Sequence, residues 1–215
     1  MANSSRLGST SDLSALIAFF LSLSSTVSCN YVYFSAIQDT RLKLAFGLWH
    51  HSWYFISIPL NGSYVFQGCI GYGTTAVDGT MKAARCFSIL ALIFGGVVFF
   101  SGCFQNNKRV GVRIEGVAYL VACLSQGLSL LLLKSPTICT DNQLIAQLQS
   151  EIDAKGSAQI DFDEKCYLST GARTCIAAIV FWFMAALASC QTASALKKEK
   201  DGGASLREPL FSGGV

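Results

Sequence analysis

The chain has 215 residues, of which 52% are hydrophobic and only 13% are charged. Soluble domains carry roughly 25% charged residues, so this composition, with a mean hydropathy of +0.45, excludes an ordinary soluble protein. The net charge of +3 is small, and its distribution along the chain tells more than its size.

Four apolar segments are each near the ~20 residues that a helix needs to cross the hydrocarbon core of a bilayer. A soluble bundle of buried helices is the alternative, but such helices carry charged residues on one face. The first segment follows an N-capping Ser11-Asp12 pair and lacks a clustered basic region, so we expect a retained helix rather than a signal peptide. Its many serines predict a face packed on protein. The segments run over residues 13–34, 82–104, 112–134 and 171–196.

The charged residues predict the orientation of the chain. Basic residues follow the second and fourth segments, whereas six of the eight charged residues in 135–170 are acidic. By the positive-inside rule both termini are cytosolic, and the loops 35–81 and 135–170 lie on the outer side. We expect an integral protein of the plasma membrane rather than an internal membrane, with a disordered tail at 197–215. The basic residues are Lys108, Arg109, Arg113, Lys197, Lys198 and Lys200.

The first loop has the chemistry of β-strands. Residues 42–49, 53–58 and 64–72 are rich in aromatic and β-branched side chains, and Asn61-Gly62 between the last two predicts a hairpin. Asn61-Gly62-Ser63 is also a glycosylation sequon. The expected fold is therefore a membrane α-helical protein, a four-helix transmembrane bundle with a small outer antiparallel β-sheet. The sheet is formed by the first loop and one strand of the second.

The outer cysteines predict disulfides. Cys139 and Cys166 share the second loop, and a bridge between them would contribute about 3 kcal/mol. Cys69 has no other cysteine in its own loop, so its partner stays open between a second-loop cysteine and the helix-end cysteines Cys29, Cys86 and Cys175.

Three side chains at or within the spans have two interpretations each. Cys103 and Cys190 lie at the cytosolic ends of spans, where palmitoylation is possible, although inert buried thiols fit equally well. Gln126 is the costly polar group of the third span. It fits an interhelical hydrogen bond better than a polar pathway.

The central triplet Gly47-Leu48-Trp49, followed by Cys69 and by Arg85 at the start of the second span, resembles the claudin superfamily, which includes the peripheral myelin and epithelial membrane proteins. Members carry a Trp, then Gly-Leu-Trp, two cysteines and the Arg. Here Ser52 stands where the family has its first cysteine, so the family's first-loop disulfide cannot form. The residues 31–33 replace the early Trp. Trp49 is expected to place its ring at the lipid interface with its N–H in water.

The resemblance implies a non-enzymatic protein of cell adhesion, lateral assembly or paracellular-type barriers, in homo-oligomers or with other membrane proteins. An auxiliary subunit of a channel or transporter is the alternative. A channel is a third, because Gly71-Tyr72-Gly73 resembles a potassium-channel filter. His50 and His51 are adjacent in a predicted strand and so face opposite sides. We therefore expect no metal site, no enzyme and no cofactor, and the bilayer rather than nucleic acid as a partner.

Overall fold

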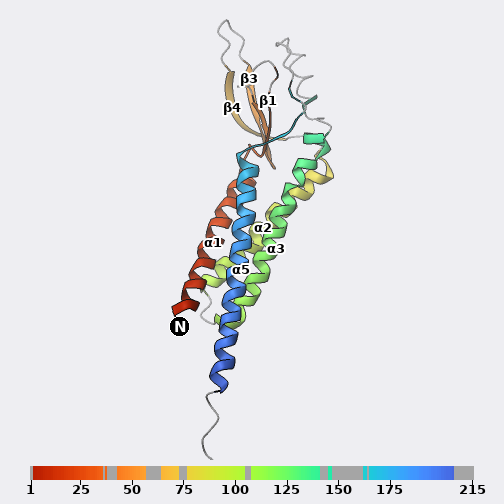
Figure 1. The fold of residues 1–215 in the computed structure, drawn as a ribbon. Helices are drawn as coiled ribbons and strands as arrows, with labels where there is room; N and C mark the ends of the chain where they lie inside the picture. Colours follow the sequence, from red (N-terminus) through yellow and green to blue (C-terminus); the bar gives the residue numbers. More distant parts are fainter. Residues whose placement is uncertain are drawn as a thin grey trace, which may run out of the picture.

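The computed structural model describes residues 2–35, 37, 43–56, 64–72, 77–104, 108–140, 145–146, 162–163 and 165–205. Its helices form an elongated bundle, and the strands form a small sheet at one end of it (Figure 1). The elements are α1 (Ala2–Val27), β1 (Val32–Ser35), β2 (Lys43–Phe46), β3 (His50–Ile56), β4 (Tyr64–Gly71), α2 (Gly79–Phe104), α3 (Lys108–Leu128), the 3₁₀ turn η1 (Ser129–Lys134), the π turn η2 (Pro136–Thr140), β5 (Tyr167–Leu168) and α5 (Thr170–Ser205).

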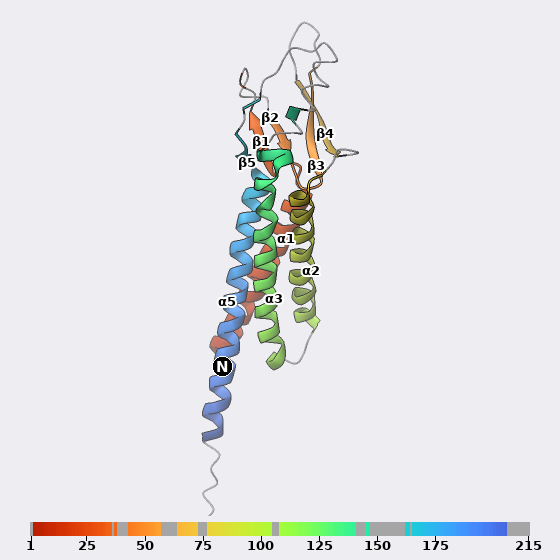
Figure 2. The same ribbon diagram turned by 90° about the vertical axis from the view of Figure 1, so that its right-hand side faces the viewer.

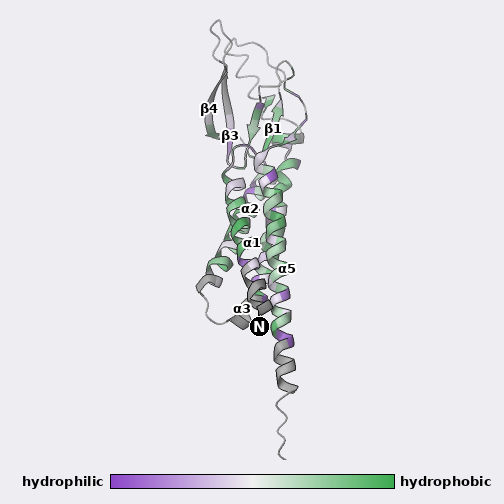
Figure 3. Ribbon diagram, turned by 60° about the vertical axis from the view of Figure 1, so that its left-hand side comes forward, coloured by the Kyte–Doolittle hydropathy of each residue, from purple (hydrophilic) through white to green (hydrophobic). Residues whose placement is uncertain are grey.

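Four helical segments are long and apolar enough to cross a membrane, which confirms the predicted fold class. They cover Thr10–Val27, Gly79–Gly102, Arg113–Lys134 and Thr170–Lys198. Apolar residues cover the sides of the bundle along these segments (Figure 3). α5 continues past the ends of the other helices at the end away from the sheet (Figure 2), so the prediction of a disordered tail from residue 197 is wrong for residues 197–205, which are helical.

The predicted outer boundary of the first span is wrong. Residues 13–34 were expected to be one helix, but α1 ends at Val27 and Val32–Ser35 forms β1. The chain leaves the helix through a turn in which the Asn30 backbone N–H donates to Ser28 Oγ (3.2 Å). Tyr31 N then donates to Phe46 O (2.9 Å) and begins the sheet. Hydropathy does not separate these segments, because a short apolar run fits a buried strand as well as a buried helix.

The sheet has five antiparallel strands in the order β4-β3-β2-β1-β5. Both predictions about it are confirmed, since the first loop supplies β2, β3 and β4 and the second loop supplies β5 beside β1. One face is apolar and buried, with Val32, Phe34, Leu44 and Phe46 packed in one cluster with the adjoining end of the bundle. The register between β3 and β4 shifts after Ser52, near Gly68 (φ 104°), as at a β-bulge.

Polar side chains connect α1 to α5 inside the bundle. Ser11 Oγ lies 2.8 Å from Ser189 Oγ, and Trp182 Nε1 donates to Ser22 Oγ (2.9 Å). Ser22 and Trp182 are fully buried. Hydrogen bonds of this kind between membrane helices contribute about 0.6–2 kcal/mol each. The serine-rich face of the first span therefore packs on protein, as predicted.

Gln126 makes an interhelical contact. Its Nε2 donates to Ser25 Oγ of α1 (3.3 Å) and to Cys175 Sγ of α5 (3.1 Å), and the side chain is fully buried. Ser129 Oγ lies 3.4 Å from the same sulfur and 3.3 Å from Tyr31 Oη. Gln126 of the third span thus connects α1, α3 and α5 near the end of the bundle that adjoins the sheet.

Gly95 of α2 makes room for the ring of Trp182, which extends from α5. A Cβ at this position would overlap the ring of Trp182, and that ring is held from its other side by stacking on Tyr119, with centroids 5.6 Å apart. Because the indole is fixed on three sides, it has no room to move away from a larger residue.

We predict that Gly95→Ala lowers the free energy of unfolding by about 1–3 kcal/mol, the usual cost of overpacking. Thermal unfolding of the purified protein in detergent would measure this. Gly127→Ala is the matched control, because a Cβ there meets no atom within 4 Å. Ala also favours a helix over Gly by roughly 0.5–1 kcal/mol. Equal loss of stability in both variants would contradict the packing role of Gly95.

Candidate functional site

The triplet Gly47-Leu48-Trp49 forms the turn between β2 and β3 at the end of the sheet that meets the bundle. Gly47 N donates to His50 O (2.7 Å) and closes the turn. A Cβ on Gly47 would overlap the carbonyl oxygen of Ser28 and lie 2.9 Å from Cys29 Cα. The turn therefore rests directly on the segment that leaves α1, and only glycine fits there.

Two side chains from outside the turn bind its consecutive carbonyls. Tyr72 Oη donates to Gly47 O (2.6 Å), and Arg85 Nε of α2 donates to Leu48 O (2.6 Å). The Leu48 side chain is fully buried in the cluster beneath the sheet. We call Gly47, Leu48, Trp49, Tyr72 and Arg85 the junction, because together they join the sheet to α2.

The guanidinium of Arg85 also lies against aromatic rings. Its Cζ is 4.9 Å from the centroid of Trp49 and 5.3 Å from that of Tyr72. Such cation–π contacts contribute about 0.5–2 kcal/mol, more where water is excluded. Burial raises the pKa of the Tyr72 phenol above its ordinary value, and the Arg85 charge offsets this only in part. Tyr72 therefore stays a neutral hydrogen-bond donor at physiological pH.

The two histidines differ in environment, as the strand alternation predicted. His50 is exposed, whereas His51 is 8% exposed. Nδ1 of His51 lies 3.3 Å from Ile70 O, and its ring is 5.4 Å from that of Tyr72. Burial, and then the neighbouring His50, lower the pKa of His51. Within the described part of the chain, no three His, Cys, Asp or Glu side chains form a group that could hold a metal ion.

Cys69 is bonded to Cys29, one of the partners that the sequence left open. The Cα atoms are 5.9 Å apart and the sequence separation is 40 residues. Ser52, at the position where the resemblance places a cysteine, is directly opposite Cys69 in the β3–β4 register. Its Oγ accepts from Ala45 N (2.9 Å) and donates to Ala45 O (3.1 Å). Ser52 thus connects β2 to β3 where a cysteine would connect β3 to β4.

The second disulfide joins Cys139 and Cys166, as the sequence analysis favoured, with Cα atoms 5.4 Å apart. It ties the π turn after α3 to the residue before β5. Both cysteines pack against the buried cluster beneath the sheet. The two disulfides therefore brace the same end of the molecule.

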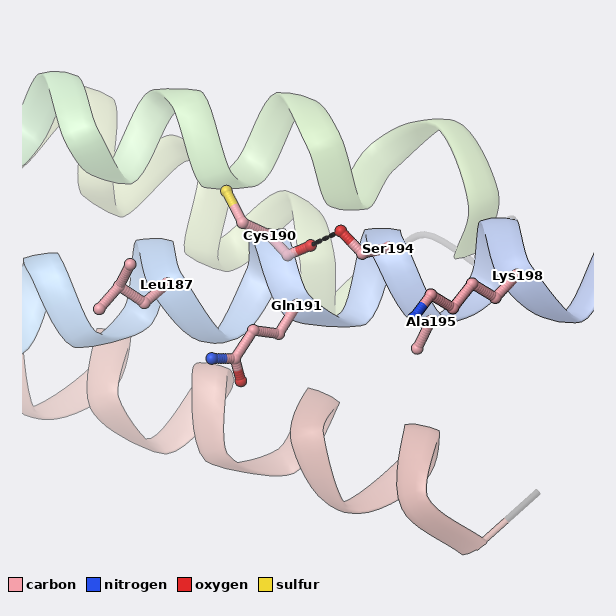
Figure 4. Close-up of a pocket in the computed structure, with 6 residues that line it drawn as sticks. All are labelled: Leu187, Cys190, Gln191, Ser194, Ala195 and Lys198. Atoms are coloured by element: carbon pink, nitrogen blue, oxygen red, sulfur yellow. Dashed lines mark hydrogen bonds between the residues drawn. The ribbon is translucent and has the colours of Figure 1, made fainter.

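The other predicted site residues lie apart from the junction. Asn61 and Gly73 lie outside the described residues, as does the side chain of Cys103. Cys190 is exposed on α5, and its Sγ is 3.1 Å from where a Cβ on Gly116 of α3 would lie. Cys190 is one of the α5 residues that line a groove (Figure 4).

Sequence reasoning missed two contributors to this end of the molecule. Tyr72 was noted only as part of a filter-like triplet, yet it is buried and binds the junction turn. Asp78 caps α2 through its Oδ1, which accepts from Met81 N (3.2 Å) and from Ser135 Oγ (2.9 Å). An Asp three residues before the first apolar residue of the span is an N-cap signal that could have been found.

No protein-family model matches this chain, and no curated protein matches it in sequence. The geometry of the junction therefore carries the functional argument.

We predict that Arg85→Met lowers the free energy of unfolding by about 1.5–3 kcal/mol, the usual contribution of a hydrogen bond to a charged group. Thermal unfolding and limited proteolysis of the sheet, both in detergent, would measure the effect. Lys82→Met removes the same charge from the exposed surface one turn earlier in α2 and should leave both unchanged. The junction would not depend on Arg85 if the two variants behaved alike.

We also predict that the double variant Cys29→Ser with Ser52→Cys forms a new bridge between position 52 and Cys69. Directly opposite residues of antiparallel strands have Cα atoms about 4.5–5.5 Å apart, which a disulfide can span. Peptide mapping without reduction would identify the bridge. In the single variant Cys29→Ser, Cys69 should instead react with an alkylating reagent. If Cys69 stays equally reactive in the double variant, the strand register is different.

Proposed function

We propose that this protein is a claudin-like tetraspan that mediates membrane adhesion and lateral assembly through its outer sheet. The observation that carries the proposal is the junction, because the residues of the resemblance that are distant in sequence meet in one contact. Arg85 binds the turn formed by Gly47-Leu48-Trp49. Such a contact fixes the orientation of the sheet relative to the bundle, as an adhesive surface requires.

The proposed orientation places the sheet outside the cell and both termini in the cytosol. The disulfides Cys29–Cys69 and Cys139–Cys166 are both at the sheet end of the bundle, and disulfides persist in oxidising compartments. The basic residues Lys197 and Lys198 end the last span, at the opposite end of the bundle from the sheet, which agrees with the positive-inside rule. These features support a plasma-membrane protein with an extracellular sheet.

The edge strand β4 is the surface that we assign to assembly. It covers eight residues, pairs with β3 on one side and ends the strand order of the described sheet. An open strand edge offers unpaired N–H and C=O groups to another strand. Cys29 bonds Cys69 within this strand, so the edge is held in place rather than free to fray.

We predict that the tagged protein concentrates at contacts between cells that lack junctions of their own, and that Ile70→Lys abolishes this enrichment. Ile70 is 42% exposed on β4, and a charge on a strand edge disfavours edge-to-edge pairing. Live imaging of mixed labelled cells, with chemical crosslinking of oligomers, would measure it.

Ile37→Lys is the matched control, because Ile37 is 67% exposed and lies outside β4. Surface biotinylation of both variants would show that they reach the plasma membrane equally. Diffuse wild-type protein that co-purifies with one large membrane protein would overturn the adhesive function and favour an auxiliary subunit.

A further inference from the structure

A groove of about 380 Å³ lies on α5 at the end of the bundle away from the sheet. The described residues that line it all belong to α5, and their side chains follow one side of that helix (Figure 4). None of these residues takes part in the junction or in the sheet. The lining residues are Leu187, Cys190, Gln191, Ser194, Ala195 and Lys198.

The groove changes from apolar to polar along the helix. Leu187, at one end, is 42% exposed although it is a large apolar residue, and Lys198, at the other end, is also exposed. With a rise of 1.5 Å per residue, these two residues are separated by about 16 Å along the axis. The groove therefore extends over a length of about half of the ~30 Å hydrocarbon core.

The position of the groove relative to the membrane follows from the length of α5. The span begins at Thr170, and about 20 helical residues cross the hydrocarbon core. The far boundary of the core therefore falls near Cys190. Leu187 lies on the hydrocarbon side of that boundary, and the backbone of Lys198 lies about 12 Å beyond it, from where its long side chain can extend back toward the headgroups.

The positive charge at one end of the groove favours an anionic ligand. Lys198 is a cation, and no acidic side chain is among the described residues that line the groove. Gln191 is exposed and carries an amide N–H₂ that can donate to a phosphate. Ser194 Oγ donates its proton to Cys190 O (2.9 Å), which leaves its oxygen available only as an acceptor.

We propose that this groove binds an anionic phospholipid of the phosphatidylserine type. One acyl chain lies along Leu187, and the phosphate lies between Gln191 and Lys198. In the proposed orientation this is the cytosolic leaflet, whose anionic lipids attract juxtamembrane lysines by about 1 kcal/mol each. The apolar contact between Leu187 and one acyl chain adds to this electrostatic attraction.

The test is native mass spectrometry of the full-length protein in detergent with either phosphatidylserine or phosphatidylcholine, both carrying the same acyl chains. We expect a retained phosphatidylserine adduct at several-fold higher occupancy than the phosphatidylcholine adduct. Lys198→Gln should lower this occupancy about fivefold or more. Lys197→Gln removes the same charge from the adjacent exposed position, which does not line the groove, and should leave most of the adduct. Leu187→Trp, which fills the apolar end, should reduce adducts of both lipids.

Equal loss of the adduct in Lys197→Gln and Lys198→Gln would mean that the basic end of the helix attracts the lipid without a specific groove. This result would overturn the proposal. Equal retention of the two lipids would overturn it as well. An intact mass raised by a hydroxylamine-sensitive acyl group would show that a thioester chain fills the groove, and this result would also reject a bound phospholipid. Far-UV circular dichroism of each variant would show that the helices are intact.

Discussion

The hydrogen bond from Arg85 to the carbonyl of Leu48 is the constraint on which the sheet end of the molecule depends. A small sheet needs an apolar face or packing against a helix to be stable, and here the sheet must also keep one orientation relative to the bundle. Arg85 lies in α2, so its 2.6 Å contact fixes the β2–β3 turn to a membrane helix. Tyr72 holds the preceding carbonyl from the side of β4. Consecutive backbone groups of one turn are thus bound by a helix and by the segment after the edge strand.

The same end is closed from the side of α1 and α5. Gly171 N donates to Asn30 O (2.7 Å), and Ser169 N donates to Tyr31 O (3.0 Å), so the start of α5 is tied to the chain between α1 and β1. Below this level Gln126, Ser25 and Cys175 connect three helices. In a lipid bilayer there is no hydrophobic driving force for helices to associate. Packing around Trp182 and these polar contacts therefore hold the helices together in the part of the bundle farther from the sheet.

The sequence predicted the parts of this arrangement that depend on composition over many residues. Span number, the sheet in the first loop and the added strand from the second loop follow from hydropathy and β-propensity, which are averages over a segment. The end of α1 at Val27 was missed, because Val32 and Phe34 are as apolar as the helix before them. The partner of Cys69 and the role of Tyr72 depend on which segments meet in space. No pattern within a single segment contains that information, so the junction was predicted only as far as Gly47-Leu48-Trp49 and Arg85.

The first disulfide connects the sheet to the segment that leaves α1. A bridge from position 52 would join two neighbouring strands across 17 residues of sequence, whereas Cys29–Cys69 spans 40. The longer loop removes more entropy from the unfolded chain, by about 0.8 kcal/mol on the loop-closure scaling. It also joins the edge strand to the residue that leaves α1, against which Gly47 packs. The bridge therefore reinforces the junction itself, and Ser52 is left to connect β2 with β3 through the backbone of Ala45.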